Sequence, residues 1–318
     1  MGTPYKTAEV RTWHPQKVEV SVGVLDTGKH LLDAVCRALP VRESWFFGLQ
    51  YFDRQDRPCF LKNGKHVTSC AAGKFGTPFS FRLRALFFPL NMKQLNEVMT
   101  VELFFYEIKN QILKEHITCP ANWYVPLAAL AAQAEFLTGE LPDYYRIMPD
   151  KVKQRLDIVG DLREPVLVQL ARLRSMMKSL TREKAMREYL KLAQTLPMFG
   201  VHYYRMKDMI NRAYLWVGVR AQGISLCDQH DKTSVIVTFS WDSISQCQYR
   251  KGAFVIEFVD QSLHDVLLLN PNIAISKQLK WLCNSYKEFL RTTYEEPDIL
   301  VKRICEQVHR EAVMRRQF

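Results

Sequence analysis

The side chains that could do chemistry are scattered along this chain and form no recognisable catalytic motif. Its eight cysteines lie far apart, with no Cys-x-x-Cys pair and no histidine at a ligand spacing nearby. The eight histidines are spread singly, and none adjoins a serine or cysteine in an order that suggests a nucleophile and its base. We therefore predict reduced, mostly buried cysteines of an intracellular protein, no metal site and no cofactor.

Motifs that bind nucleotides or build hydrolytic sites are also absent from the sequence. There is no G-x-G-x-x-G, G-x-x-x-x-G-K-[ST], G-x-S-x-G or H-E-x-x-H. The stretch Gly73–Thr77 is similar to a phosphate loop only superficially, because it lacks the length and the closing Lys-Ser/Thr. Spacing alone does not exclude a site assembled from distant residues. The sequence nevertheless predicts no catalytic residue and a protein that works by binding.

The distribution of charge favours an anionic partner without identifying it. The net charge is +11, and the first 89 residues hold 13 basic and 7 acidic side chains. Such an excess suits nucleic acid, an anionic membrane face or an acidic protein. The basic residues are dispersed and the aromatic residues have core-like spacing, so no stacking face for bases is indicated. A basic nucleic-acid-binding protein therefore remains only an alternative.

The length and composition predict several folded domains. A chain of 318 residues exceeds one ordinary core, and 47% hydrophobic residues are typical of folded proteins. No run of 18 apolar residues could span a bilayer, and the N-terminus lacks the apolar stretch of a signal peptide. We expect two or three domains in a protein that is neither membrane-spanning nor secreted.

Residues 1–89 have the pattern of a ubiquitin-like β-grasp lobe. A strand pair at 8–13 and 18–22 precedes a helix at 31–39, and further strands follow at 45–53 and 79–88. The stretch Trp45–Tyr51 holds four aromatic residues around Gly48, which indicates a buried strand whose rings form much of the core. The glycine would allow a large ring or another backbone to approach closely.

The rest of the chain divides into a helical part and a strand-rich part. Residues 90–198 predict a helical lobe whose last helix, 182–196, has Thr181 as its N-cap. Residues 199–297 predict a pleckstrin-homology or phosphotyrosine-binding-like β-sandwich of seven short strands, one end of which is plugged by a C-terminal helix. Residues 298–318 predict the start of a separate helical segment.

Several short sequence segments, in the order in which they occur, resemble segments of the FERM domains of the ezrin–radixin–moesin/merlin group. They are Thr27–Leu31, Trp45–Tyr51, Leu103–Phe105, Ala131–Ala134, Glu188–Gln194, Met198–Tyr204 and Phe239–Trp241. The resemblance implies an α+β fold of three lobes in a clover, the second similar to acyl-CoA-binding protein. Band-four-point-one-like proteins and FERM-bearing phosphatases are near alternatives.

The resemblance also implies a function. FERM modules of this group are adaptors that bind the cytoplasmic tails of membrane receptors and adhesion proteins and link them to cortical actin. We therefore expect a cytoplasmic protein, peripheral at the inner face of the plasma membrane. A C-terminal tail outside this chain is expected to mask the module, and no nucleic acid is expected as a partner.

The first site that the resemblance implies is a cleft for a phosphoinositide head group. Lys62, Lys65 and Lys277 match the family positions on the facing sides of this cleft. Convergent ammonium groups attract phosphate, and a helix N-terminus adds a favourable dipole. His66 stands where the family has a lysine, and neither Gln261–Ser262 nor Thr292–Thr293 keeps the family's basic residues. Weak phosphoinositide binding is therefore expected.

The second implied site is a groove for an extended peptide. It lies between the strand at 244–249 and the helix at 275–290, where a free strand edge could accept a receptor tail as an additional strand. The expected groove residues are Ile244, Ser245, Gln246, Cys247, Gln248, Tyr249, Ile275, Leu279, Leu282 and Tyr286.

Overall fold

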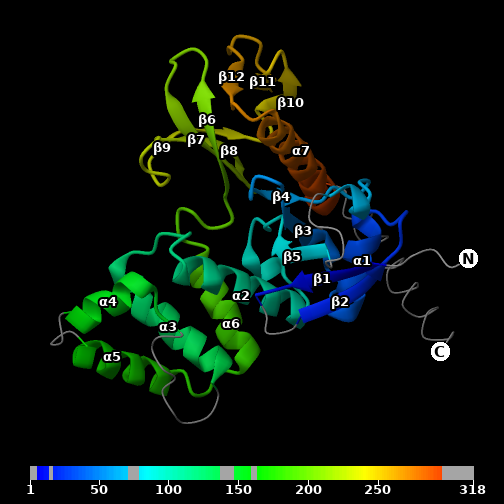
Figure 1. Ribbon diagram of the computed structural model, residues 1–318. Helices are drawn as coiled ribbons and strands as arrows, with labels where there is room; N and C mark the ends of the chain where they lie inside the picture. Colours follow the sequence, from blue (N-terminus) through cyan, green and yellow to red (C-terminus); the bar gives the residue numbers. More distant parts are fainter. Residues whose placement is uncertain (1–5, 14–16, 71–78, 137–146, 159–162, 296–318) are drawn as a thin grey trace, which may run out of the picture.

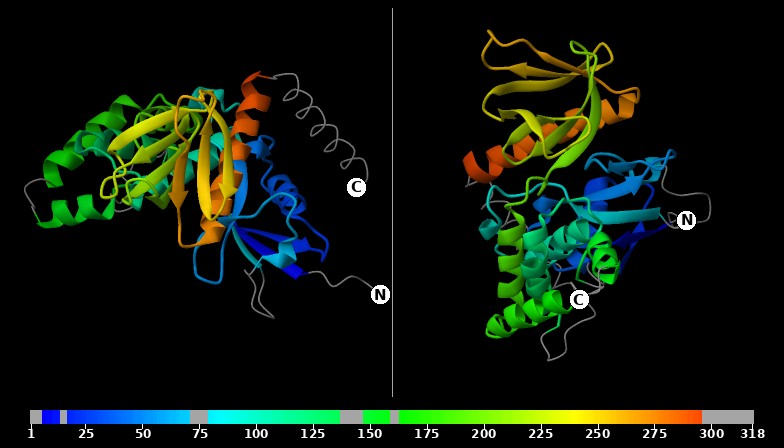
Figure 2. Two further views of the ribbon diagram at one scale, coloured as in Figure 1. Left: turned by 90° about the horizontal axis from the view of Figure 1, so that it is seen from above. Right: turned by 90° about the vertical axis from the view of Figure 1, so that its left-hand side faces the viewer.

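The chain folds into three lobes that meet at one junction, as the ribbon views of the computed structural model show (Figures 1 and 2). The structure describes residues 6–13, 17–70, 79–136, 147–158 and 163–295. The segments 71–78 and 298–318, which contain the glycine-rich stretch and the expected C-terminal segment, lie outside the described residues. No described helix is both long enough and apolar enough to cross a membrane.

The first lobe is a mixed sheet covered by one helix. Its elements are β1 Lys6–Arg11, β2 Lys17–Val22, α1 Gly28–Ala38, a 3₁₀ turn Ser44–Phe46, β3 Phe47–Phe52, β4 Pro58–Phe60, a 3₁₀ turn Val67–Ser69 and β5 Phe79–Ala85. The strand order is β2-β1-β5-β3-β4, with β1 parallel to β5. The predicted β-grasp fold is confirmed.

The aromatic stretch of this lobe is only partly a strand. Trp45 lies in the 3₁₀ turn, and the strand begins at Phe47. The expectation for Gly48 is confirmed, because a Cβ there would lie 3.0 Å from a ring carbon of Phe60. A short strand that the sequence did not reveal, β4, carries this ring.

The second lobe is helical, as predicted. It contains a 3₁₀ turn Met92–Gln94, α2 Val98–Leu113, α3 Ala121–Glu135, α4 Asp150–Ile158, α5 Arg163–Met176 and α6 Arg182–Ala193. Thr181 caps α6 by accepting a hydrogen bond from the Lys184 backbone N–H. The start of α2 has no side-chain cap of its own. Glu43 of the first lobe serves it instead, by accepting from the backbone N–H groups of Asn96 and Glu97 at 3.2 and 3.1 Å.

The third lobe is the predicted sandwich with its helix. Its elements are β6 His202–Asp208, β7 Tyr214–Arg220, β8 Gly223–Cys227, β9 Val235–Ser240, β10 Ile244–Arg250, β11 Ala253–Phe258, β12 Val266–Leu269, α7 Ile273–Leu290 and a π-helical turn Arg291–Glu295. The strands follow the order β10-β11-β12-β6-β7-β8-β9, so β9 and β10 form the two free edges. α7 packs against β10 and β11.

An aromatic cluster joins the three lobes. Phe46 of the first lobe contacts Phe104 of α2 and Phe289 of α7, both with ring centroids 5.7 Å apart. Phe88, in the linker after β5, contacts Phe104 at 5.4 Å. Its backbone N–H donates to the buried hydroxyl of Tyr286 at 2.8 Å. The lobes therefore share one continuous core.

Replacing Tyr286 by phenylalanine should destabilise the fold by leaving the buried Phe88 N–H without an acceptor. We expect a loss of about 1–3 kcal/mol in the free energy of unfolding, measured by urea denaturation. Tyr214→Phe, at a tyrosine that is 43% exposed, is the control and should change little. Equal stability of the two variants would contradict this role for Tyr286.

His202 makes the junction sensitive to acid. Its half-buried ring lies between Phe60 and Phe88, and Nε2 donates to the Leu86 carbonyl at 2.9 Å. Burial lowers the pKa of His202 to about 4, and the charge of Arg84 adds to this, although the hydrogen bond opposes it. Below an unfolded pKa of about 6.5, the unfolded chain binds a proton that the folded chain excludes, so stability falls as the pH drops.

We therefore expect wild type to lose about 2 kcal/mol of unfolding free energy from this residue between pH 7 and pH 5. His202→Gln, which does not titrate, should show a correspondingly smaller pH dependence. Denaturant titrations of both proteins at the two pH values measure the difference. Identical pH profiles would show that His202 does not remain neutral at the junction.

Candidate functional site

The turn that carries Lys62 is fixed against the start of α1. The backbone N–H of Gly28 donates to the Lys65 carbonyl at 2.8 Å, and that of Lys29 donates to the Asn63 carbonyl at 3.0 Å. A Cβ on Gly28 would lie 2.5 Å from the Lys62 carbonyl oxygen, so a glycine is required for this approach. Lys62 is therefore held by backbone contacts rather than by a free loop.

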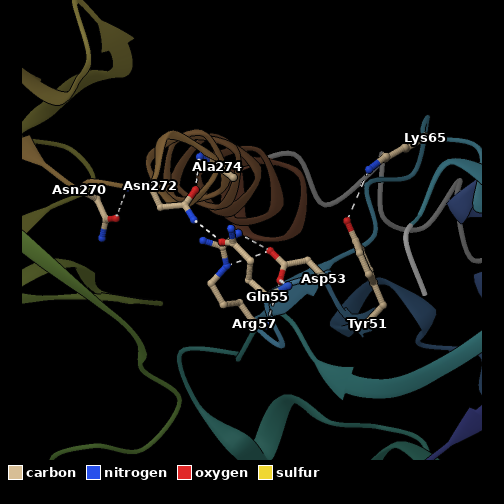
Figure 3. A network of polar contacts seen from close by, with 8 residues as sticks. All are labelled: Tyr51, Asp53, Gln55, Arg57, Lys65, Asn270, Asn272 and Ala274. Atoms are coloured by element: carbon tan, nitrogen blue, oxygen red, sulfur yellow. Dashed lines mark hydrogen bonds and ion pairs between the residues drawn. The ribbon is translucent and has the colours of Figure 1, made fainter. Parts of the chain in front are cut away.

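The start of α7 is docked on the first lobe. Asn272 caps the helix, accepting from the Ala274 N–H at 2.9 Å, and its side-chain amide donates to Gln55 at 3.4 Å (Figure 3). Gln55 belongs to the β3–β4 turn, which is braced by the ion pair of Asp53 and Arg57. The first turns of α7 thereby face the lysine-bearing turn of the first lobe.

A cleft of about 1040 Å³ lies between these two lobes. Lys62 and Asn63 line it from the first lobe, and Lys277, Lys280 and Trp281 line it from α7. Lys29 also reaches it, but Asp33 pairs with that ammonium at 3.0 Å. The cleft thus combines cationic groups with an aromatic wall.

The electrostatics of the cleft favour an anion. The pKa of Lys62 is lowered, first by partial burial and then by the positive charges of Lys65, Lys277 and Lys280. The Lys62 ammonium lies 6.0 Å from the Trp281 ring centroid. An anion placed among these ammonium groups would relieve their mutual repulsion and favour the charged form of Lys62.

Two of the three predicted lysines, Lys62 and Lys277, line the same cleft, and the third, Lys65, does not. Lys65 does not line the cleft: its ammonium points to the Tyr51 hydroxyl at 3.5 Å and contributes only its charge (Figure 3). Lys280 lines the cleft but was missed by the sequence analysis. The signal that could have revealed it is its position one helical turn after Lys277.

A hollow adjoins the strand and helix for which a peptide groove was predicted, but its lining differs from the predicted residues. β10 is a free edge beside α7, and a hollow of about 510 Å³ adjoins it. Ser245 and Gln246 line the hollow from the strand side, and Asn284, Lys287 and Glu288 line it from the helix.

Five expected groove residues are instead part of the core. Leu279, Leu282 and Tyr286 are 0% exposed, and Ile244 and Cys247 are 1% exposed, so none of them presents a surface to a peptide. The sequence analysis selected the apolar face of α7, which is the face that packs on the sheet. Gln248, Tyr249 and Ile275 are half-buried.

The strand edge is partly occupied by a residue of the same chain. The Lys287 ammonium donates to the carbonyl oxygens of Ile244 and Ser245 at 2.6 and 3.1 Å. These two carbonyls stand at an irregular point of the β10–β11 register, between Ile244 and Gln246. An added strand could therefore pair directly only beyond Ser245 unless Lys287 moved.

No metal centre accompanies these sites in the described part of the chain, where no three His, Cys, Asp or Glu side chains are placed to hold an ion. The arrangement is suited to binding an anion in the cleft and an extended chain at the edge.

Comparisons with protein families match all three lobes. The model of the FERM N-terminal domain matches residues 10–71, that of the FERM central domain residues 91–204, and that of the FERM C-terminal PH-like domain residues 210–298. Among curated proteins, Moesin/ezrin/radixin homolog 1 of Aedes aegypti is 30% identical over the whole chain. The chain spans 56% of that relative's length.

Solved structures are similar over most of the chain. The FERM domain of Drosophila Merlin, in complex with its C-terminal domain, has a TM-score of 0.83 and 27% identity, covering 92% of this chain and 99% of that one. The MyTH4-FERM MF2 domain of Dictyostelium discoideum myosin VII has a TM-score of 0.70 at 15% identity, covering 88% and 59% respectively. The latter likeness supports the fold alone.

The order of the lobes, their domain matches along the chain and the likeness to Merlin agree with one another. This chain is a FERM domain of the ezrin–radixin–moesin/merlin group.

Proposed function

We propose that this FERM domain is a membrane–cytoskeleton adaptor, which binds phosphoinositide head groups and the cytoplasmic tails of membrane proteins and links them to cortical actin. The observation that carries the proposal is the cationic cleft between the first and third lobes. The cleft unites lysines from two lobes, and Glu288, which also lines it, is paired with Arg291. We place the protein in the cytoplasm, at the inner face of the plasma membrane.

The strength of the membrane contact follows from the number of cleft lysines. Each basic residue near an anionic membrane contributes about 1 kcal/mol, and salt screens the attraction over about 8–10 Å. Lys62, Lys277 and Lys280 can therefore support recruitment but not tight anchoring. Thr292, at a position where the family has a basic residue, is buried and donates to the carbonyls of Glu288 and Phe289, so it adds no charge.

A receptor tail would supply the remaining affinity at the β10 edge. Ser245 and Gln246 are exposed there, and Glu288 adds an acidic group to the rim of the hollow. The solved Drosophila Merlin structure is a complex of a FERM domain with a C-terminal domain. By analogy, we propose that a C-terminal tail of the full-length protein masks the binding surfaces of this module.

The double variant Lys62→Glu/Lys277→Glu should sediment with phosphoinositide liposomes at least about tenfold more weakly than wild type. Two attractive charges become repulsive, at about 1 kcal/mol for each basic residue lost. The measurement is co-sedimentation with liposomes that contain or lack phosphatidylinositol bisphosphate, at low and physiological salt.

The matched control is Lys178→Glu/Lys184→Glu, which makes the same change in net charge on the exposed surface of the second lobe. It should bind nearly as well as wild type. Equal loss in both variants would mean that net charge, not the cleft, holds the lipid. No sedimentation of wild type even at low salt would show that the adaptor works without the membrane.

Binding of receptor-tail peptides should depend on the β10 edge. Gln246→Pro removes a backbone donor from the edge strand and should abolish binding. Lys287→Ala frees the two carbonyls that it caps and should strengthen binding roughly 2–10-fold, the value of about one hydrogen bond. Fluorescence anisotropy with labelled juxtamembrane peptides measures both effects, and thermal melting checks the fold. If the proline variant folds and still binds every peptide, the tails bind elsewhere.

A further inference from the structure

A second cavity, of about 640 Å³, lies where the three lobes meet. The end of β5 lines it from the first lobe, α2 and the turn after it from the second, and β6, β7 and the β8–β9 turn from the third. No described residue lines both this junction cavity and the lysine cleft. Ligand cavities are typically about 300–1,000 Å³ and occur preferentially at domain interfaces. The junction cavity therefore has the size and position of a ligand site.

The acidic side chains that line the junction cavity already have partners within the protein. Glu107 forms an ion pair with Arg84 at 2.6 Å, and Glu115 forms one with Lys151 at 2.5 Å. The Asp231 carboxylate accepts hydrogen bonds from the backbone N–H and the hydroxyl of the residue two positions later, at 2.8 and 2.7 Å. None of these carboxylates is left to bind a cationic ligand without first giving up a partner.

Three basic side chains of the cavity, in contrast, have no such partners. His116 lies in the turn after α2, and His230 and Lys232 lie in the β8–β9 turn. Among the described residues, none of the three forms an ion pair or a hydrogen bond through its side chain. The Lys232 ammonium lies over the rings of Trp216 and Tyr203, 4.2 and 5.4 Å from their centroids. Both rings line the cavity, so this contact holds Lys232 at the cavity wall.

The titration of these groups reflects the excess of positive charge. The pKa of His116 is lowered first by partial burial and then by the charges of Arg84, Lys114 and Lys232, against which Glu107 acts weakly. Burial also lowers the pKa of Lys232. His116 belongs to the second lobe and Lys232 to the third, so their repulsion acts across the boundary between the lobes. An anion bound between them would relieve this repulsion.

We propose that the junction cavity binds a small phosphate ester, whose phosphate group lies between His116 and Lys232. A phosphate ester carries about −1.5 to −2 charges at pH 7 and three strong acceptor oxygens, so it can accept hydrogen bonds from donors on two lobes. The cavity is much larger than one phosphate group and leaves room for an organic part beside the rings of Tyr203 and Trp216, which contact each other at 6.4 Å. The bound ester would link the second lobe to the third.

Titration calorimetry of the whole chain with phenyl phosphate tests the proposal. All measurements use the Lys62→Glu/Lys277→Glu background, so that the lysine cleft does not contribute. This background protein should bind one equivalent saturably. Adding Lys232→Ala should weaken binding at least about tenfold, the value of one hydrogen bond to a charged group, and adding His116→Ala roughly 2–10-fold. Thermal melting verifies that each variant is folded.

The matched controls are Lys251→Ala and His264→Ala, which remove the same side chains from exposed turns of the third lobe away from the cavity. Both should bind phenyl phosphate as the background protein does. Equal loss of binding in the controls would overturn the proposal, because net charge rather than the cavity would then hold the anion.

Liposome co-sedimentation of the same variants identifies the source of the phosphate. Sedimentation with phosphoinositide liposomes that depends on Lys232 would assign the phosphate to a lipid head group. Binding of phenyl phosphate that depends on Lys232, without such sedimentation, would assign it to a soluble ester, and either result supports the site. If the background protein binds neither probe, the proposal is wrong. That failure would leave the lysine cleft untested, because its lysines are absent from every protein measured.

Discussion

The backbone and ring of Phe88 are the point at which the three lobes are joined. The ring contacts Phe104 of the second lobe and Phe199 and His202 at the start of the third, with centroids 5.4 to 6.3 Å apart. The N–H group of the same residue is satisfied by Tyr286 of α7. A buried donor left without a partner costs about 1–3 kcal/mol, so this one contact couples the linker to the third lobe. It fixes the relative positions of the lobes together with the Glu43 contact to the start of α2 and the Asn272–Gln55 hydrogen bond.

The cationic cleft depends on the contacts that hold the first and third lobes together. The ammonium groups of Lys62 and Lys277 repel each other, and two freely moving lobes would separate them. The fold instead holds the lysine-bearing turn against α1 and the start of α7 against the β3–β4 turn. The repulsion is thus retained in the free protein, and an anion placed between the lysines would relieve it, which is how a preorganised site gains affinity.

Much of the fold could be predicted from the sequence because hydrophobic periodicity marks elements that pack on one face. The strand at 214–220 and the cap at Thr181 are examples in which local pattern and structure agree. β4 could not be predicted, since three residues are too few to show a period. The prediction of the groove-lining residues was wrong for a different reason. The apolar stripe of α7 marks the face that is buried against the sheet, whereas a peptide could contact only the opposite, polar face. Lys287 has no sequence signal at all, because its partners are backbone carbonyls.

The shared aromatic cluster also constrains how this protein can change over evolutionary time. Phe46, Phe104 and Phe289 lie far apart in the chain but pack ring against ring. If recombination exchanged the first lobe alone, the residue at position 46 of the new lobe would come from a protein in which it packed against different rings. The lobes must therefore be inherited together, and a change of ring size at one position selects for a compensating change at another. We expect such joint inheritance to leave covariation among these three positions in relatives.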